Sequence, residues 1–379
     1  MSGIYFHIPF CKQACHYCNF HFSTSLRQKT PLLNAMLREL ELRRDYPGDA
    51  VVQTLYLGGG TPSLLEIDEL HRLFEHIYRL FPVAPDAEVT LEANPDDLTA
   101  AKIAALRQTP VNRLSIGIQS FSDADLQFMN RAHNSGEAQR CIEMALNAGF
   151  TDLSLDLIYG TPGMSDAQWV ANIETVLAFD VPHLSCYCLT VEPQTALDHF
   201  VKKGKARPVD DAQAARQLEY LMHRLNTAGY EHYEISNFAK PGRYSRHNTS
   251  YWTGEAYLGI GPSAHSFNGV SRQWNVANNA RYIQALEPEL PDWKALFELE
   301  TLTPEQRYNE YVMTSLRTQW GCDLARIRNM GKRFEAFFMR EVVPFLEDGS
   351  VHRRGEVFLL TQKGKLIGDY VASELFWVE

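Results

Sequence analysis

Short apolar stretches alternate with longer amphipathic ones through the first half of the chain. Six stretches rich in β-branched, aromatic and leucine residues predict strands, at residues 3–9, 53–59, 87–94, 113–120, 153–160 and 183–190. Between them, apolar residues recur every three or four positions, which is typical of helices that cover a sheet. Gly149 closes one of these stretches, where a helix C-terminal glycine is expected. Strand and helix alternating six times predict parallel βα units.

This alternation fits two architectures, a doubly wound open sheet or a barrel that is complete or partial. In both, ligands bind at the carboxyl ends of the strands, so polar residues there are the first candidates for a site. Beyond residue 290 the pattern changes to helices over 303–320 and 324–349, a hairpin at 350–361 and a closing helix. We expect a large domain over 1–290 and a smaller α+β, winged-helix-like domain over 291–379.

Composition and charge narrow the functional class. The chain has 36 basic and 46 acidic residues, and its net charge of −10 argues against a nucleic-acid-binding protein. No apolar stretch reaches the roughly 18 residues of a membrane span, and the N-terminal residues lack the features of a signal peptide. Seven cysteines, an odd number, do not indicate a secreted disulfide framework. We therefore expect a cytoplasmic protein, in which clustered cysteines point to a metal centre.

Three cysteines lie together directly after the first predicted strand. Cys11, Cys15 and Cys18 have the spacing C-x3-C-x2-C, and Phe20 stands where a fourth cysteine would fit. A structural zinc site takes four ligands, and a nearby histidine would complete one here. An ordinary iron–sulfur cluster takes four thiolates. Three thiolates suit a four-iron cluster whose fourth iron binds an external ligand.

Polar residues also lie at the ends of the later strands. The sequence GGGTP at 58–62 follows the second strand, and glycines there allow a ligand to approach the backbone closely. Glu92, Gln119 and Asp156 lie at or near later strand ends. A carboxylate within an apolar strand is costly unless it is paired or bound to a ligand. Each alone is as well explained by a structural hydrogen bond, but together, beside the cysteines, they favour a site.

The cysteine spacing and its place before six βα units resemble the radical S-adenosylmethionine (SAM) superfamily. In that family three cysteines hold a [4Fe-4S] cluster, and the open iron binds the amino and carboxylate groups of SAM. The resemblance implies an α/β fold with a partial (β/α)6 barrel, and it assigns the cluster to Cys11, Cys15 and Cys18. It also implies a set of SAM contacts, namely Tyr5, Tyr17, Gly59, Gly60, Thr61, Glu92, Gln119, Arg131 and Asp156. Structural zinc is kept as the alternative.

Within the superfamily the chain resembles the group that contains oxygen-independent coproporphyrinogen III dehydrogenase and the heme chaperone family HemW. The dehydrogenase has a further cysteine where this chain has Phe20, and a longer extension before its first cluster cysteine. The sequence RHNTSYW at 246–252 is similar to the HNxxYW motif of HemW. That similarity implies heme contacts from His247, Asn248, Tyr251 and Trp252. An imidazole is a competent axial ligand of heme iron, although the residues alone favour a loop histidine capped by packed aromatic side chains.

The resemblance implies a heme chaperone that binds a [4Fe-4S] cluster, SAM and heme and delivers heme to apo-hemoproteins, in particular respiratory ones. It further implies an electron donor to the cluster, peripheral membrane association and no nucleic-acid partner. The second hypothesis is an enzyme, an oxygen-independent coproporphyrinogen III oxidase that decarboxylates propionate side chains through an adenosyl radical. The sequence does not decide whether the chain is an enzyme.

Overall fold

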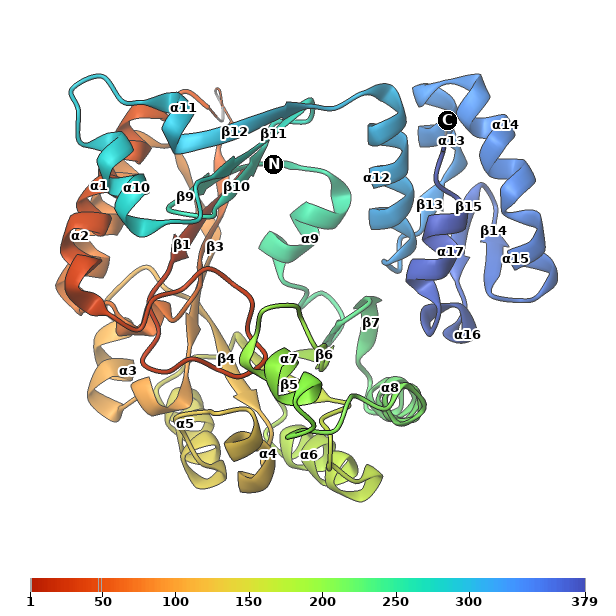
Figure 1. Ribbon diagram of the computed structural model, residues 1–379, viewed down its shortest axis with the longest axis horizontal. Helices are drawn as coiled ribbons and strands as arrows, with labels where there is room; N and C mark the ends of the chain where they lie inside the picture. The colour runs from red at the N-terminus through yellow and green to blue at the C-terminus, as the bar shows by residue number, and fades with distance from the viewer. Residues whose placement is uncertain (1, 47, 49, 379) are drawn as a thin grey trace.

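The computed structural model describes residues 2–46, 48 and 50–378 and contains one large sheet and one small one (Figure 1). The centre of the large sheet is formed by β1 (Ser2–Ile8), β2 (Val52–Gly59), β3 (Val83–Ala93), β4 (Arg113–Gln119), β5 (Leu153–Tyr159) and β6 (His183–Cys188). Each of these strands pairs in parallel with the next one along the chain. The six predicted strands are thus confirmed. Since β1 and β6 lie at separate places in the linear strand order of the described residues, the barrel is open.

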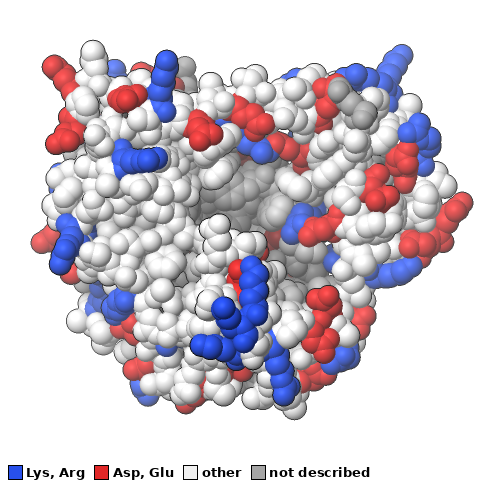
Figure 2. Space-filling view, viewed as in Figure 1, with Lys and Arg blue, Asp and Glu red and all other residues white. Residues whose placement is uncertain are grey.

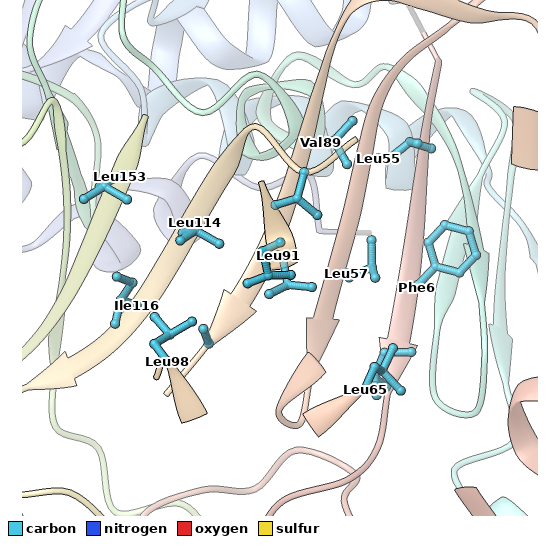
Figure 3. Close-up of a cluster of buried hydrophobic side chains, with 14 of the residues drawn as sticks. Phe6, Leu55, Leu57, Leu65, Val89, Leu91, Leu98, Leu114, Ile116 and Leu153 are labelled. Carbon is cyan, nitrogen blue, oxygen red and sulfur yellow. The ribbon is translucent and has the colours of Figure 1, made fainter. Parts of the chain in front are cut away.

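Helices that return the chain from one strand to the next cover the outer face of the sheet (Figure 1). They are α1 (Lys29–Leu42), α2 (Ile67–Leu80), α3 (Ala100–Leu106), α4 (Asp123–Phe128), α5 (Ser135–Asn147) and α6 (Asp166–Ala178), with 3-10 turns at Leu26–Gln28, Pro62–Leu64 and Pro95–Asp97. The core between helices and strands includes Leu57, Leu91 and Ile116 (Figure 3). Gly149 has a φ of 86° directly after α5, so the predicted glycine stop is confirmed.

Both edges of the sheet are extended by strands that mostly run antiparallel to their neighbours. One edge carries β8 (Asn237–Ala239) and β7 (Glu231–Glu234), and the other carries β9 (Ala256–Ile260), β10 (His265–Phe267), β11 (Ser271–Asn275) and β12 (Phe297–Thr301). β9 pairs in parallel with β1. The connecting helices are α7 (Ala196–Lys202), α8 (Asp211–Thr227), α9 (Arg246–Thr253), α10 (Asn279–Leu286) and α11 (Trp293–Leu296). β12 belongs to the large sheet although it follows residue 290, where we expected the first domain to end.

A C-terminal module packs beside the large sheet and has its own hydrophobic core (Figure 1). Its helices are α12 (Pro304–Leu316), α13 (Leu324–Met330), α14 (Lys332–Glu341), α15 (Val343–Glu347), α16 (Gln362–Lys365) and α17 (Gly368–Glu374). Its sheet has the order β13 (Cys322–Asp323), β15 (Val357–Leu360) and β14 (Val351–Arg354). The hairpin expected at 350–361 is therefore present. None of the helices within the described residues is long and apolar enough to cross a membrane.

Several polar contacts join the module to the large sheet. Lys365 Nζ lies 2.9 Å from His232 Nδ1, and Arg272 of β11 forms an ion pair with Glu310 of α12. Helix α9 packs against both β2 and α12. These contacts hold the module beside the carboxyl ends of the central strands, where the predicted site residues gather.

Candidate functional site

The cysteine loop follows β1 and is fixed by backbone hydrogen bonds to other parts of the fold. Cys11 N donates to Ser23 O over 3.1 Å, and His16 N donates to Met129 O over 3.1 Å. Cys11, Cys15 and Cys18 are all half-buried free thiols. In the part of the chain that the structure describes, no three His, Cys, Asp or Glu side chains form a group that could hold one metal ion. In a four-iron cluster each thiolate binds a different iron, so the fit is judged from the groups around the thiols.

Donors from the end of β2 and from the turn between α4 and α5 reach the thiols. Arg131 Nη1 donates to Cys15 Sγ over 3.2 Å, and Thr61 Oγ1 donates to Cys11 Sγ over 3.4 Å. Burial raises the pKa of Cys11 to about 11, and the neighbouring Cys18 and Cys15 raise it further while Thr61 opposes them. The thiols are therefore close enough to repel one another as anions. Iron binding deprotonates a thiol, and the positive iron ions of a cluster would offset the repulsion between the three thiolates. The thiols and the donors around them therefore fit a cluster.

Arg131 and Gln119, both predicted SAM contacts, lie close together beside Gly117. Arg131 Nη2 donates to Asn94 Oδ1 over 2.6 Å and to Gly117 O over 2.8 Å, while its buried Nε has no partner among the described atoms. A Cβ at Gly117 would lie 2.9 Å from Gln119 Nε2. Gln119 itself has a φ of 67°, in the left-handed region that a glutamine rarely adopts. Backbone strain and an unpaired donor at one point are typical of a ligand site.

Glu92 explains the predicted glycine run. Its carboxylate accepts hydrogen bonds from Tyr56 OH at 2.8 Å and from Gly59 N at 3.1 Å. A Cβ at Gly58 would lie 2.9 Å from the Glu92 carboxylate, and a Cβ at Gly59, where φ is 99°, would lie 2.5 Å from the ring of His7. Glycine is therefore required at positions 58 and 59 by the packing of Glu92 and His7, independently of any bound ligand.

The remaining predicted SAM contacts lie around the same strand ends. Gly60 N donates to Ile8 O over 2.9 Å, and Thr61 N donates to Phe10 O over 2.7 Å, so both are held against the end of β1. Tyr5 OH lies 3.2 Å from His7 Nδ1. Tyr17 packs beside a separate small apolar cluster, and burial raises the pKa of its phenol. The structure therefore brings these side chains to one edge of the sheet.

Two carboxyl groups at this edge have raised pKa values. Burial raises the pKa of Glu92 to about 7, and nearby Asp156 adds to this. Burial also raises the pKa of Asp156 to about 6, with Arg113 and Ser115 opposing. Asp156 Oδ1 accepts a 3.3 Å hydrogen bond from Ser115. A cationic ligand beside these groups would favour their ionised forms.

Glu92 should therefore make the ligand-free protein less stable as the pH rises. The unfolded chain ionises this group near its usual pKa of 4.5, whereas the folded chain ionises it at about 7. The free energy of unfolding therefore falls by about 1–3 kcal/mol as the pH rises from the unfolded pKa to the folded pKa, and this contribution is fully present only below pH 4.5. We expect the melting temperature of Glu92→Gln, minus that of the wild type, to increase between pH 5 and pH 8. A difference that does not change with pH would contradict the raised pKa.

A cavity of about 770 Å³ opens beside these residues, between the sheet and the C-terminal module. The surface is visibly hollowed at this place in Figure 2. Tyr5, Gly59 and Glu92 form part of its wall, and residues of α9, α12 and α13 form other parts. Phe20, with 66% of its surface exposed, also lines the cavity. The candidate SAM site and the cavity are therefore contiguous.

The segment RHNTSYW lies within a helix, α9, whereas the alternative explanation placed its histidine in a loop. His247 has no exposed surface, and its ring stacks on Tyr56 with centroids 5.0 Å apart. Its Nδ1 lies 2.7 Å from Thr54 Oγ1 and its Nε2 lies 2.8 Å from Tyr251 OH. Burial lowers the pKa of His247 to about 3. Both ring nitrogens are thus already hydrogen-bonded, and the phenol of Tyr251 occupies the Nε2 position that an iron ligand would need.

The other motif side chains line the cavity directly. Asn248, Tyr251 and Trp252 are half-buried on its wall. Sequence reasoning missed Tyr56, which contacts both Glu92 and His247. It could have been found, because Thr54, Tyr56 and Gly58 alternate along β2 and so share one face of the strand.

Comparisons with known proteins agree with this arrangement. The model of the radical SAM superfamily matches residues 5–176, and that of the HemN C-terminal domain matches residues 302–367. A heme chaperone HemW from Bacillus subtilis is 34% identical over 374 residues, which cover 98% of each chain. Another from Mycobacterium tuberculosis (strain ATCC 25618 / H37Rv) is 38% identical over 378 residues, covering 98% of this chain and 94% of the relative. The chain belongs to the HemW family of radical SAM proteins.

The fold of this HemW-family chain is shared with a solved enzyme. Coproporphyrinogen III oxidase (HemN) from Escherichia coli, a radical SAM enzyme, superposes with a TM-score of 0.85 over 99% of this chain and 90% of that one. Their sequences are 23% identical, so this likeness concerns the fold. The predicted resemblance and the α/β fold are confirmed. Membership of the radical SAM superfamily implies a [4Fe-4S] cluster and SAM as cofactors.

Proposed function

We propose that this HemW-family protein is a heme chaperone. It binds a [4Fe-4S] cluster and SAM at the strand ends, binds heme in the adjoining cavity and delivers heme to apo-hemoproteins, in particular respiratory ones. One observation carries the proposal: Asn248, Tyr251 and Trp252 of the HNxxYW motif line the same cavity of about 770 Å³ as the SAM-site residues Gly59 and Glu92. The relatives named heme chaperone HemW, which match nearly the whole chain, support it.

The cofactor site is assigned to the residues already described. Cys11, Cys15 and Cys18 would hold the cluster, which supplies an open iron for SAM and accepts an electron from an external donor. The backbone at Gly59–Thr61 and the Glu92 carboxylate would hold the amino group of SAM. The remaining contacts are assigned to Tyr5, Tyr17, Gln119, Arg131 and Asp156. The unpartnered Nε of Arg131 and the strained Gln119 backbone support this assignment.

The heme site is assigned to the aromatic part of the cavity. A porphyrin is flat and largely apolar, so it binds well between aromatic side chains. Tyr251 and Trp252 would cover one face, and Asn248 offers an amide to the rim. His247 supports this wall from behind through its hydrogen bond to Tyr251. Peripheral contact with a membrane would bring such a protein close to respiratory acceptors.

Heme titration and enzyme turnover on one anoxic preparation test the proposal. We expect the reconstituted protein to bind equimolar heme and to transfer it to an apo-hemoprotein, followed by the absorbance of the acceptor. We expect no conversion of coproporphyrinogen III when SAM and a reductant are added. Repeated turnover to protoporphyrinogen IX, without stable heme binding, would favour the coproporphyrinogen oxidase hypothesis instead.

A further inference from the structure

The wall that the C-terminal module contributes to the cavity is basic. Along α12 the lining residues are Arg307, Glu310, Tyr311 and Thr314, which are spaced as one face of a helix. Along α13 they are Arg326 and Met330, one turn apart. Two short helical faces are therefore turned toward the same space as α9.

Two of the arginines on this wall have no anionic partner in the part of the chain that the structure describes. Arg307 and Arg326 are exposed, and neither lies within ion-pairing distance of a carboxylate of the described residues. The guanidinium of Arg326 lies over the ring of Tyr311, 4.4 Å from its centroid. Arg272, the third arginine at the cavity, is already neutralised by Glu310. The module therefore presents two unpaired cations beside an aromatic ring.

Among the described residues, the acidic groups that line the cavity leave Arg307 and Arg326 unpaired. Glu92 belongs to the SAM side, where Tyr56 and Gly59 hold it. Glu255 lies two residues after the end of α9, and Glu310 of α12 is paired with Arg272. The cavity is thus divided into an aromatic side, formed by Tyr251 and Trp252, and a cationic side, formed by the module.

We infer that Arg307 and Arg326 bind the carboxylates of the porphyrin and so fix its orientation in the cavity. This inference rests on the proposed heme-binding function. Heme is apolar over most of its plane and has two propionates at one edge, which matches a cavity lined both by aromatic side chains and by two unpaired guanidinium groups. A guanidinium donates two parallel hydrogen bonds to a carboxylate, a geometry that a lysine does not reproduce. The ligand class is a planar tetrapyrrole with free carboxylates along one edge.

The test compares heme with heme dimethyl ester, in which both carboxylates are blocked. The wild type should bind heme about tenfold more tightly than the ester, since two partly exposed ion pairs are lost in the ester. In Arg307→Gln/Arg326→Gln the affinity for heme should fall about tenfold, while the affinity for the ester stays the same. Arg307→Lys/Arg326→Lys keeps the charges but not the paired hydrogen bonds of a guanidinium. It should therefore restore only part of the preference for heme over the ester.

Arg354→Gln is the matched control, because Arg354 is exposed on β14 of the same module and does not line the cavity. It should bind both ligands as the wild type does. If the wild type binds neither heme nor the ester, the proposed function itself fails. If the wild type binds heme but Arg307→Gln/Arg326→Gln keeps the full preference for heme over the ester, only the role of the arginines is overturned.

Discussion

Replacing Cys15 with serine should abolish the iron–sulfur cluster, while replacing Cys188 should leave it unchanged. A cluster held by three thiolates loses one of its attachments in Cys15→Ser, and a hydroxyl is a poor ligand for it. Cys188 is also a half-buried free thiol, but it lies at the end of β6 and outside the cysteine loop. After anoxic reconstitution, wild type and Cys188→Ser should carry about four irons per chain, and Cys15→Ser close to none.

Folding and ligand response complete this test. Serine is close to cysteine in size and Cys15 is half-buried, so the melting temperatures of the metal-free proteins should agree within a few degrees. SAM should change the electron paramagnetic resonance spectrum of the reduced wild type, because it binds the open iron. Full iron content in Cys15→Ser would refute the cluster assignment. Wild type that purifies with zinc and without iron would support the zinc alternative.

The central strands were predictable because buried parallel strands form continuous apolar runs. Each of the six predicted ranges overlaps its strand, for example 153–160 against Leu153–Tyr159. The edge strands β7, β8, β11 and β12 were missed because they are short or polar and lack such a run. β12, Phe297–Thr301, is largely exposed and carries two glutamates, so only its pairing with β11 makes it a strand. This pairing is also why the large sheet extends past residue 290.

The gathering of polar residues at strand ends was predictable from a rule of parallel sheets, but their individual roles were not. Glu92 and Asp156 meet where expected, whereas the left-handed backbone of Gln119 depends on the contacts around Gly117. The cationic wall of the cavity was not predictable, because it depends on how α12 packs against α9 and how α13 packs against α12.

The helical state of the HNxxYW segment had a signal that we did not use. Ser245 Oγ accepts a hydrogen bond from Asn248 N over 3.3 Å at the start of α9, and Gly254 has a φ of 74° at its end. Serine and glycine in these positions are typical helix caps. Recognising the caps would have placed His247 and Tyr251 one turn apart, in contact with each other.

Because of this contact, we predict that a substitution of His247 lowers stability, whereas a substitution of Trp252 lowers heme affinity. His247→Ala removes a fully buried ring together with its hydrogen bonds to Thr54 and Tyr251. Thr54 has almost no exposed surface, so its hydroxyl is left without this partner. Loss of a buried aromatic ring costs about 3–5 kcal/mol, and an unpaired polar group adds to it. The melting temperature of His247→Ala should therefore fall by many degrees in the absence of any ligand, so a loss of heme binding in this variant alone would not identify a heme contact.

Trp252→Ala isolates the contribution to heme binding. Trp252 is half-buried on the cavity wall, with Arg317 5.7 Å from its ring centroid, and no hydrogen bond within the described residues depends on its indole. Its stability should stay near that of the wild type, while heme affinity should fall at least tenfold, as is usual for an aromatic anchor. Trp293→Ala is the control, since Trp293 also has a partly accessible indole, somewhat more exposed than that of Trp252, but does not line this cavity. Equal heme affinity in Trp252→Ala and wild type, measured by titration under anoxia, would place the heme outside this cavity.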